Sequence, residues 1–152
     1  MTRFRSHIYS ALLVILTLGA FACSDTLWDE LPSPVSEFLS RYYPEETVES
    51  EQWTDGDTLY TVKLKNDAWI TFDKSLKWQT VNGRGVPLPE IFLFDELPPA
   101  VYEYLQSIES LAAVYRVNRT PSQLTLELLD NAVVYDYATG HITMPDVNGG
   151  AS

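Results

Sequence analysis

The chain has 152 residues, of which 45% are hydrophobic and 20% are charged, values typical of one globular domain with a substantial core. Its formal net charge is −11. A surface this acidic favours solubility and disfavours binding to nucleic acid and to anionic lipid head groups, whereas a neutral or basic protein partner is compatible with it. The single cysteine excludes an internal disulfide.

The first 22 residues have the features of a secretory signal peptide. Arg3 and Arg5 form a basic start, residues 8–18 carry no charge, and small residues follow. A membrane-spanning helix needs ~20 apolar residues, so this stretch is too short to span. We therefore predict that residues 1–22 are removed on export. Because two arginines leave with them, the net charge changes from −11 to −13.

Cys23 stands directly after this segment, where a bacterial lipoprotein carries its lipid-modified cysteine. Residues 23–27 would then be a short tether. The usual lipobox is Leu-small-small-Cys, and here Ala20 and Phe21 occupy its first two places. Ala20, Phe21 and Ala22 also fit ordinary small-x-small cleavage, so both routes stay open. Both predict an exported protein, periplasmic or attached to the outer membrane or cell surface of a Gram-negative bacterium.

A four-residue string then occurs twice along the chain. Asp29-Glu30-Leu31-Pro32 returns as Asp95-Glu96-Leu97-Pro98, 66 residues later. Each copy precedes apolar residues spaced i, i+3, i+4, i+7, which is the apolar stripe of one helix face. These stripes are Val35, Phe38, Leu39 and Tyr42 in the first copy and Val101, Tyr104, Leu105 and Ile108 in the second. The pattern predicts two repeats of one unit.

Each unit is predicted to open with a helix, over residues 33–43 and 98–110. Ser33 is the expected N-cap of the first helix, with Pro34 at its first helical position. Alternating apolar and polar residues between turn signals predict about four strands after each helix. The strands are expected near 48–53, 60–64, 68–72 and 77–81, and then near 113–118, 124–128, 132–136 and 141–144.

The predicted fold class is therefore α+β, a tandem repeat of two units, each with one helix and an antiparallel sheet. The repeats span residues 28–81 and 94–144, the linker 82–93, and a flexible tail 145–152. One unit alone, at about 60 residues, is only marginally stable. We therefore expect the two copies to share a core or to join their sheets, forming one domain over residues 28–144.

Several strings in this order resemble the PepSY-like family of exported bacterial proteins, described as β-lactamase-inhibitor-like. They are Trp28-Asp29-Glu30-Leu31-Pro32, Phe38-Leu39 with Tyr42-Tyr43-Pro44, Ile70-Thr71-Phe72-Asp73 with Trp78, and Tyr135-Asp136 with Thr139-Gly140. The resemblance implies a tandem α+β fold similar to β-lactamase inhibitory protein, a binding or inhibitory role, and no known catalytic residues. Leu76 departs from the family pattern, which usually has glycine there, so a different first turn is expected.

No pattern in the sequence predicts catalysis, a metal site or a cofactor. His141 is the only histidine after the leader, so neither a zinc cluster nor a cysteine–histidine pair is formed. Paired carboxylates such as Asp29-Glu30 and Asp95-Glu96 would allow acid–base chemistry only within a cleft. At turns and helix starts, such pairs are expected to be caps or solvated surface.

The candidate binding residues are Trp53, Lys63, Trp69 and Arg84. If Ile70 faces the helix, then Trp69 lies on the opposite face with Lys63, and Trp53 is expected to join them. Two interpretations stay open: the other half of the chain covers these rings, or a partner protein does.

Two main functions follow from these observations. The first is a non-catalytic exported binding protein, such as an inhibitor or modulator of an extracytoplasmic enzyme, with an unknown protein partner. The alternative is an envelope structural or assembly lipoprotein without inhibitory activity. A hydrolase that uses paired carboxylates has the least support.

Overall fold

The structure, a computed structural model, describes residues 26–145, and in it each repeat has two α-helices and then four strands, with a short 3₁₀ helix between them in the second repeat. The first repeat consists of α2 (Thr26–Glu30), α3 (Ser33–Tyr42), β1 (Val48–Thr54), β2 (Leu59–Leu64), β3 (Trp69–Asp73) and β4 (Trp78–Asn82). The second consists of α4 (Glu90–Glu96), α5 (Pro99–Ser107), the 3₁₀ helix η1 (Leu111–Ala113), β5 (Arg116–Arg119), β6 (Gln123–Glu127), β7 (Ala132–Asp136) and β8 (Ile142–Thr143). The predicted α+β tandem repeat is confirmed.

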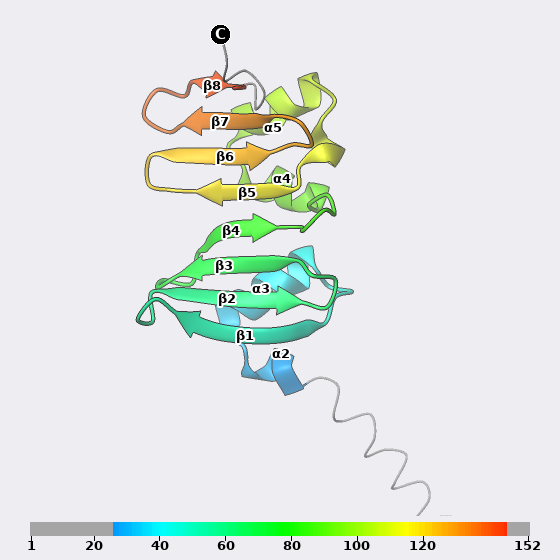
Figure 1. The fold of residues 1–152 in the computed structure, drawn as a ribbon, viewed down its shortest axis with the longest axis vertical. Helices are drawn as coiled ribbons and strands as arrows, with labels where there is room; N and C mark the ends of the chain where they lie inside the picture. Colours follow the sequence, from blue (N-terminus) through cyan, green and yellow to red (C-terminus); the bar gives the residue numbers. More distant parts are fainter. Residues whose placement is uncertain (1–25, 146–152) are drawn as a thin grey trace, which may run out of the picture.

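All eight strands form one antiparallel sheet in which each strand pairs with the next along the chain. Figure 1 shows the strands in a single layer, with α3, α4 and α5 all behind the same face. We call this helix-bearing face the inner face and the opposite face the outer face. In the same view α2 lies beyond the edge strand β1.

The apolar stripe of each predicted helix faces the sheet. Val35, Phe38, Leu39 and Tyr42 of α3 are all buried, as are Val101 and Leu105 of α5. The start of α3 differs from the prediction: Pro32 is the N-cap and Ser33 is already helical, without a side-chain cap. Because proline fixes φ near the helical value, the prolines define this start without a hydroxyl cap.

The two repeats are joined edge to edge where β4 pairs with β5. The join has only three residue pairs, Thr80–Asn118, Val81–Val117 and Asn82–Arg116. Thr80 Oγ1 and Asn118 Oδ1 lie 2.6 Å apart across it, within hydrogen-bonding distance. The expected union of the two sheets is therefore observed, and the join forms near the middle of the sheet.

The repeats also share a core, through a helix that begins inside the expected linker and runs into the second repeat. Helix α4 begins at Glu90, and its Phe92 is fully buried. The Phe92 ring centroid lies 5.4 Å from that of Tyr42 and 5.2 Å from that of Trp78, both in edge-to-face geometry. A side chain of the second repeat thus completes the core of the first.

The turn between β3 and β4 differs in length, as expected, from the corresponding turn of the second repeat, between β7 and β8. Asp73 N–H bonds to the Lys77 carbonyl, whereas Asp136 N–H bonds to the His141 carbonyl, one residue further along. Both turns still contain a left-handed residue near their end, Leu76 at φ 59° and Gly140 at φ 69°. Leu76 therefore adopts the conformation that glycine provides in the second turn.

Candidate functional site

The outer face carries no helix in the described residues (Figure 1). Its central row is made of uncharged polar side chains. Paired residues on adjacent antiparallel strands share a face. The strand pairing therefore aligns a row across six strands, namely Gln52, Thr61, Thr71, Thr80, Asn118 and Thr125. This row forms a flat, polar surface, and a large exposed side chain lies beside it.

Trp69 is that side chain, in the neighbouring row. It pairs with Lys63 on one side and with Asn82 on the other, and 41% of its surface is exposed. The Arg84 guanidinium lies over its ring, 5.5 Å from the ring centroid. Within residues 26–145, neither the second half of the sheet nor a helix covers the ring. The Arg84 loop, within the predicted linker, lies over it.

Lys63, Trp69 and Arg84, here called the Trp69 patch, surround a small hollow together with Asp67. The hollow has a volume of about 150 Å³. The structure therefore brings together three of the four residues predicted to bind. The Lys63 ammonium lies 2.7 Å from a Glu49 carboxylate oxygen and 3.8 Å from one of Asp67. The i, i+4 spacing of Lys63 and Asp67 is visible in the sequence, whereas the contact with Glu49 depends on strand pairing.

The prediction that Trp53 joins this face was wrong. Trp53 pairs with buried Tyr60 and packs edge-to-face on it, with ring centroids 5.0 Å apart, so it lies on the inner face. The cause is a β-bulge between Val48 and Ser50, which shifts the register by one residue. Because side chains alternate between faces, one extra residue moves Trp53 to the other side of the sheet.

The loop that carries Arg84 is fixed by its own sequence. The Asn82 side chain accepts a hydrogen bond from Arg84 N–H at 2.9 Å, and Gly83 N–H donates to the Tyr115 carbonyl at 2.9 Å. A Cβ atom on Gly83 would lie 1.9 Å from the Val86 carbonyl oxygen, so only glycine fits there. Arg84 itself has φ 53°, a left-handed conformation that is unfavourable for arginine.

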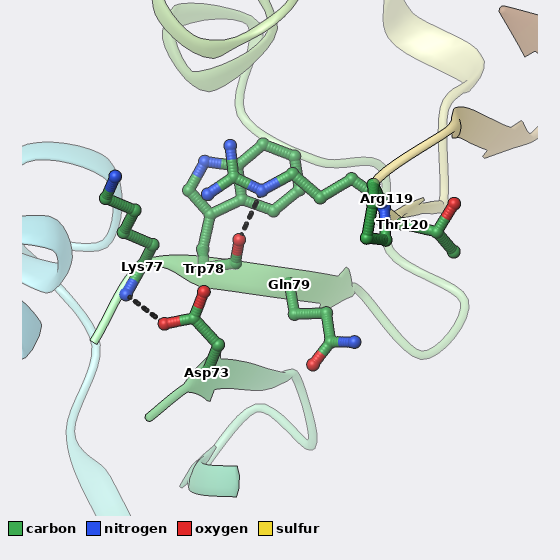
Figure 2. Close-up of a pocket in the computed structure, with 7 residues that line it drawn as sticks. Asp73, Lys77, Trp78, Gln79, Arg119 and Thr120 are labelled. Carbon is green, nitrogen blue, oxygen red and sulfur yellow. Dashed lines mark hydrogen bonds between the residues drawn. The ribbon is translucent and has the colours of Figure 1, made fainter. Parts of the chain in front are cut away.

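A second cavity, of about 380 Å³, lies at the end of the join between β4 and β5 and was not anticipated. Figure 2 shows the Arg119 side chain lying across the Trp78 ring at this place. The guanidinium is 4.0 Å from the ring centroid, and its Nε donates to the Trp78 carbonyl at 2.5 Å. Arg119 thereby replaces a strand-to-strand hydrogen bond where the two strands separate, which is a structural role.

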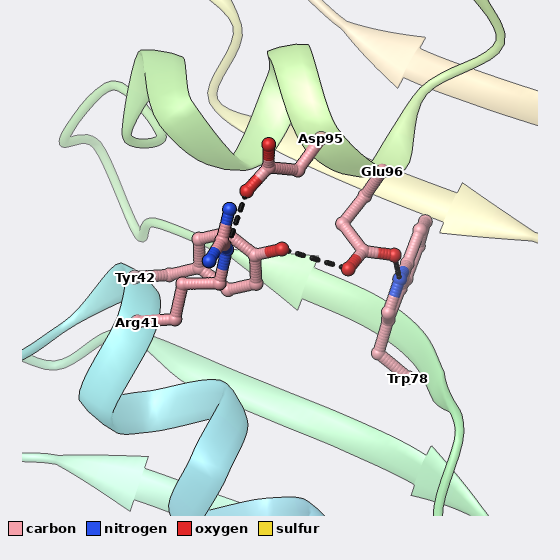
Figure 3. A network of polar contacts seen from close by, with 5 residues as sticks. All are labelled: Arg41, Tyr42, Trp78, Asp95 and Glu96. Atoms are coloured by element: carbon pink, nitrogen blue, oxygen red, sulfur yellow. Dashed lines mark hydrogen bonds and ion pairs between the residues drawn. The ribbon is translucent and has the colours of Figure 1, made fainter.

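The second acidic pair connects the two repeats (Figure 3). Arg41 Nε lies 2.6 Å from an Asp95 carboxylate oxygen, while Glu96 accepts 2.8 Å hydrogen bonds from the Tyr42 hydroxyl and the Trp78 indole. Burial is the main reason that the pKa of Tyr42 is raised well above its ordinary value, and the hydrogen bond to Glu96 raises it further. The hydroxyl therefore stays protonated and acts as a donor. The expectation of a cap or solvated surface was therefore wrong for Glu96, whereas Asp95 is exposed and forms its ion pair at the surface.

The remaining chemical groups are not assembled into a reactive site in the part of the chain that the structure describes. Asp29 and Glu30, the first copy of the acidic pair, are exposed, as is His141. No group of three or more histidine, cysteine or acidic residues within 26–145 is arranged to hold a metal ion. Over the same range, no helix is long and apolar enough to cross a membrane. Cys23 and the predicted signal peptide lie outside the described residues.

Solved structures of several periplasmic proteins have the same fold. One is described as a putative calcium-regulated periplasmic protein of Bacteroides thetaiotaomicron; it is 17% identical, with a TM-score of 0.65 over 78% of this chain and 93% of its own. A periplasmic protein of the DUF2874 family from Bacteroides vulgatus is 19% identical, with a TM-score of 0.63 over 78% and 93%. A third, also from Bacteroides vulgatus, is 19% identical with a TM-score of 0.62 over 78% and 94%. At these identities the likeness concerns the fold alone.

The sequence comparison agrees with this. None of the curated proteins compared with the chain matches it. One family profile matches twice, over residues 27–77 and 58–143, and the two matches together include nearly the whole described chain. Its description is "Putative beta-lactamase-inhibitor-like, PepSY-like". The chain, with its two helix-and-sheet repeats, therefore belongs to the PepSY-like family.

Proposed function

We propose that this protein is a non-catalytic exported binding protein that uses the outer face of its first repeat, around the Trp69 patch, to bind another protein. The observation that carries the proposal is the exposure of Trp69, 41%, on a face that no helix of residues 26–145 covers. Apolar surface left in water forgoes about 25 cal/mol per Å² of burial, and tryptophan with arginine is a frequent centre of protein interfaces. The partner would be an extracytoplasmic enzyme that the protein inhibits or modulates.

Three further features support a binding role. Family members are described as β-lactamase-inhibitor-like, and similar structures are of periplasmic proteins. The row of threonines on the outer face forms a flat, polar surface around one large side chain, Trp69. An interface with a small hydrophobic centre usually has this composition. In residues 26–145 the acidic pairs are either exposed or engaged between the repeats, which supports a non-catalytic protein.

The predicted leader and Cys23 support an exported lipoprotein. A diacylated Cys23 would attach the domain to a membrane through the short segment that precedes α2. Because α2 lies beyond the β1 edge of the sheet (Figure 1), the outer face would stay accessible from the periplasm or the medium.

Site-specific photo-cross-linking in the native envelope tests the proposal. A photoreactive residue at Thr71, which lies beside Trp69 on the outer face, is compared with one at exposed Glu103 of α5 on the helical side. We expect one dominant protein to be cross-linked from position 71 and not from position 103. The same mixture of envelope proteins from both positions would instead favour the structural or assembly role, and no cross-link from position 71 would contradict the proposal.

A further inference from the structure

The two basic side chains around the hollow of the Trp69 patch differ in their partners: Lys63 contacts carboxylates, whereas Arg84 contacts an aromatic ring. The Lys63 ammonium is held by Glu49 at 2.7 Å, and this contact is the main reason that the pKa of Lys63 is raised; the nearby positive charge of Arg84 acts in the opposite direction. The Arg84 guanidinium has the Trp69 ring beneath it. Among the described residues, no carboxylate lies within ion-pair distance, 4.0 Å, of Arg84.

The size of the hollow limits what can enter it. Pockets for small molecules usually have volumes of ~300–1,000 Å³, well above the 150 Å³ found here. A space this small between an indole ring and a guanidinium suits one side chain of a partner protein. Its other walls are the side chains of Lys63 and Asp67, so charged groups lie at its rim beside the Trp69 ring.

We infer that the hollow receives an aspartate or glutamate side chain of the partner, an inference that rests on the binding role proposed above. A carboxylate can accept two parallel hydrogen bonds from the planar guanidinium of Arg84, and the methylene groups of its side chain would lie against Trp69. A lysine or arginine guest would meet the like charges of Arg84 and Lys63, with Asp67 as the one opposing group in the hollow.

The backbone around Arg84 supports this assignment. The residue occupies a left-handed conformation, φ 53°, in which glycine would cost less, so the arginine is present at the expense of backbone strain. The loop is fixed by the Asn82 side chain and by the Gly83 contact described above. The backbone that carries Arg84 is thus fixed before binding, and the guanidinium lies over the Trp69 ring, so less entropy is lost when a carboxylate arrives.

Peptides from a random library, selected on the purified exported chain, provide the probe. The peptides that bind this hollow are identified as those whose binding is lost with Trp69→Ala. We expect these peptides to contain an aspartate or glutamate whose replacement by the amide weakens binding at least ~10-fold. Arg84→Gln should weaken binding to the same extent, and combining the two changes should add little, because both remove one contact.

The outcomes separate the inference from the proposed function. Trp69-dependent peptides that lack an acidic residue, or whose affinity is unchanged by Arg84→Gln, would overturn the carboxylate assignment and leave the binding role intact. A library that yields no Trp69-dependent peptide would contradict the binding surface itself, and the inference with it. Arg84→Lys serves as the matched control: it keeps the charge but loses the paired hydrogen bonds, so an intermediate affinity is expected.

Discussion

Trp78 in the first repeat donates its indole N–H to Glu96 in the second repeat, over 2.8 Å (Figure 3). The other oxygen of the same carboxylate accepts the Tyr42 hydroxyl at 2.8 Å. Both donors belong to buried residues, so each needs this acceptor. One acidic side chain thus satisfies two groups of the opposite repeat, and it belongs to the string that the sequence repeats.

We therefore expect Glu96→Ala to lower the free energy of unfolding by about 2–4 kcal/mol, because two buried donors lose their acceptor. The matched control is Glu30→Ala, which changes the corresponding residue of the first copy. Glu30 is exposed, so its replacement should change stability by no more than ~0.5 kcal/mol. Urea unfolding of the two variants measures both values, and equal losses would contradict the assigned role of Glu96.

The neighbouring ion pair predicts a dependence of stability on pH. The hydrogen bond from Arg41, with its charge, holds the pKa of Asp95 below its ordinary value of 3.8. A carboxyl group with a depressed pKa in the folded state stabilises the fold above its unfolded pKa, and this stability is lost as pH falls through the folded pKa. Asp95→Asn should thus be less stable than the natural chain at neutral pH.

Below pH 3.8 the difference between the two proteins should shrink as the carboxyl group takes up a proton. Arg41→Gln should give the same pattern, since it removes the other member of the pair. Urea midpoints measured between neutral pH and about pH 2.5 provide the test. A difference that stays constant across this range would show that the pair makes no titratable contribution.

Gly83 is expected to be the least replaceable residue of the Arg84 loop. In Gly83→Ala the new Cβ would collide with the Val86 carbonyl, at 1.9 Å, so the backbone must move, at a cost above ~2 kcal/mol. Gly85→Ala is the control: nothing lies within 4 Å of its Cβ, and only its φ of +90° opposes alanine. That strain should cost about 1–2 kcal/mol. Thermal unfolding compares the two, and an equal or smaller loss at Gly83 would contradict the loop geometry.

Lipidation of Cys23 is tested in cells, since this residue precedes the described part of the chain. Cells labelled with a radioactive fatty acid should incorporate the label into the natural protein and none into Cys23→Ser. Normal processing of Cys23→Ser, with no label in the natural protein, would identify Ala22 as an ordinary cleavage site.

The sequence allowed both repeats and all eight strands to be predicted, because each depends on a local pattern. Tyr60, Val62 and Leu64 alternate with polar residues, so β2 could be placed and oriented without knowing its neighbours. The stripe from Val35 to Tyr42 likewise defined α3. The same alternation placed Trp69 on the outer face, opposite Ile70, where the structure has it.

Features that depend on contacts distant in sequence could not be predicted. The bulge in β1 leaves no sequence signature, and it moved Trp53 to the inner face and brought Glu49 next to Lys63. Glu96 looked like any acidic residue at a helix terminus, because its donors are 18 and 54 positions away. Helix α4 was not predicted, because the prolines and glycines that precede it indicated an irregular linker. Its stability comes from burying Phe92 against the other repeat.

The measurement that most directly tests the proposed binding surface is a comparison of Trp69→Ala with Phe72→Ala. The two residues are three positions apart in β3 and lie on opposite faces of the sheet. Phe72 is 1% exposed, so its truncation should cost about 3–5 kcal/mol of stability, whereas Trp69→Ala should cost about 1 kcal/mol or less.

The affinity of Trp69→Ala for the protein cross-linked from position 71 should fall at least ~30-fold, or about 2 kcal/mol. A binding surface around Trp69 predicts this combination of a nearly unchanged melting curve and a strongly weakened complex. A loss of stability as large as that of Phe72→Ala, or an unchanged affinity, would contradict it.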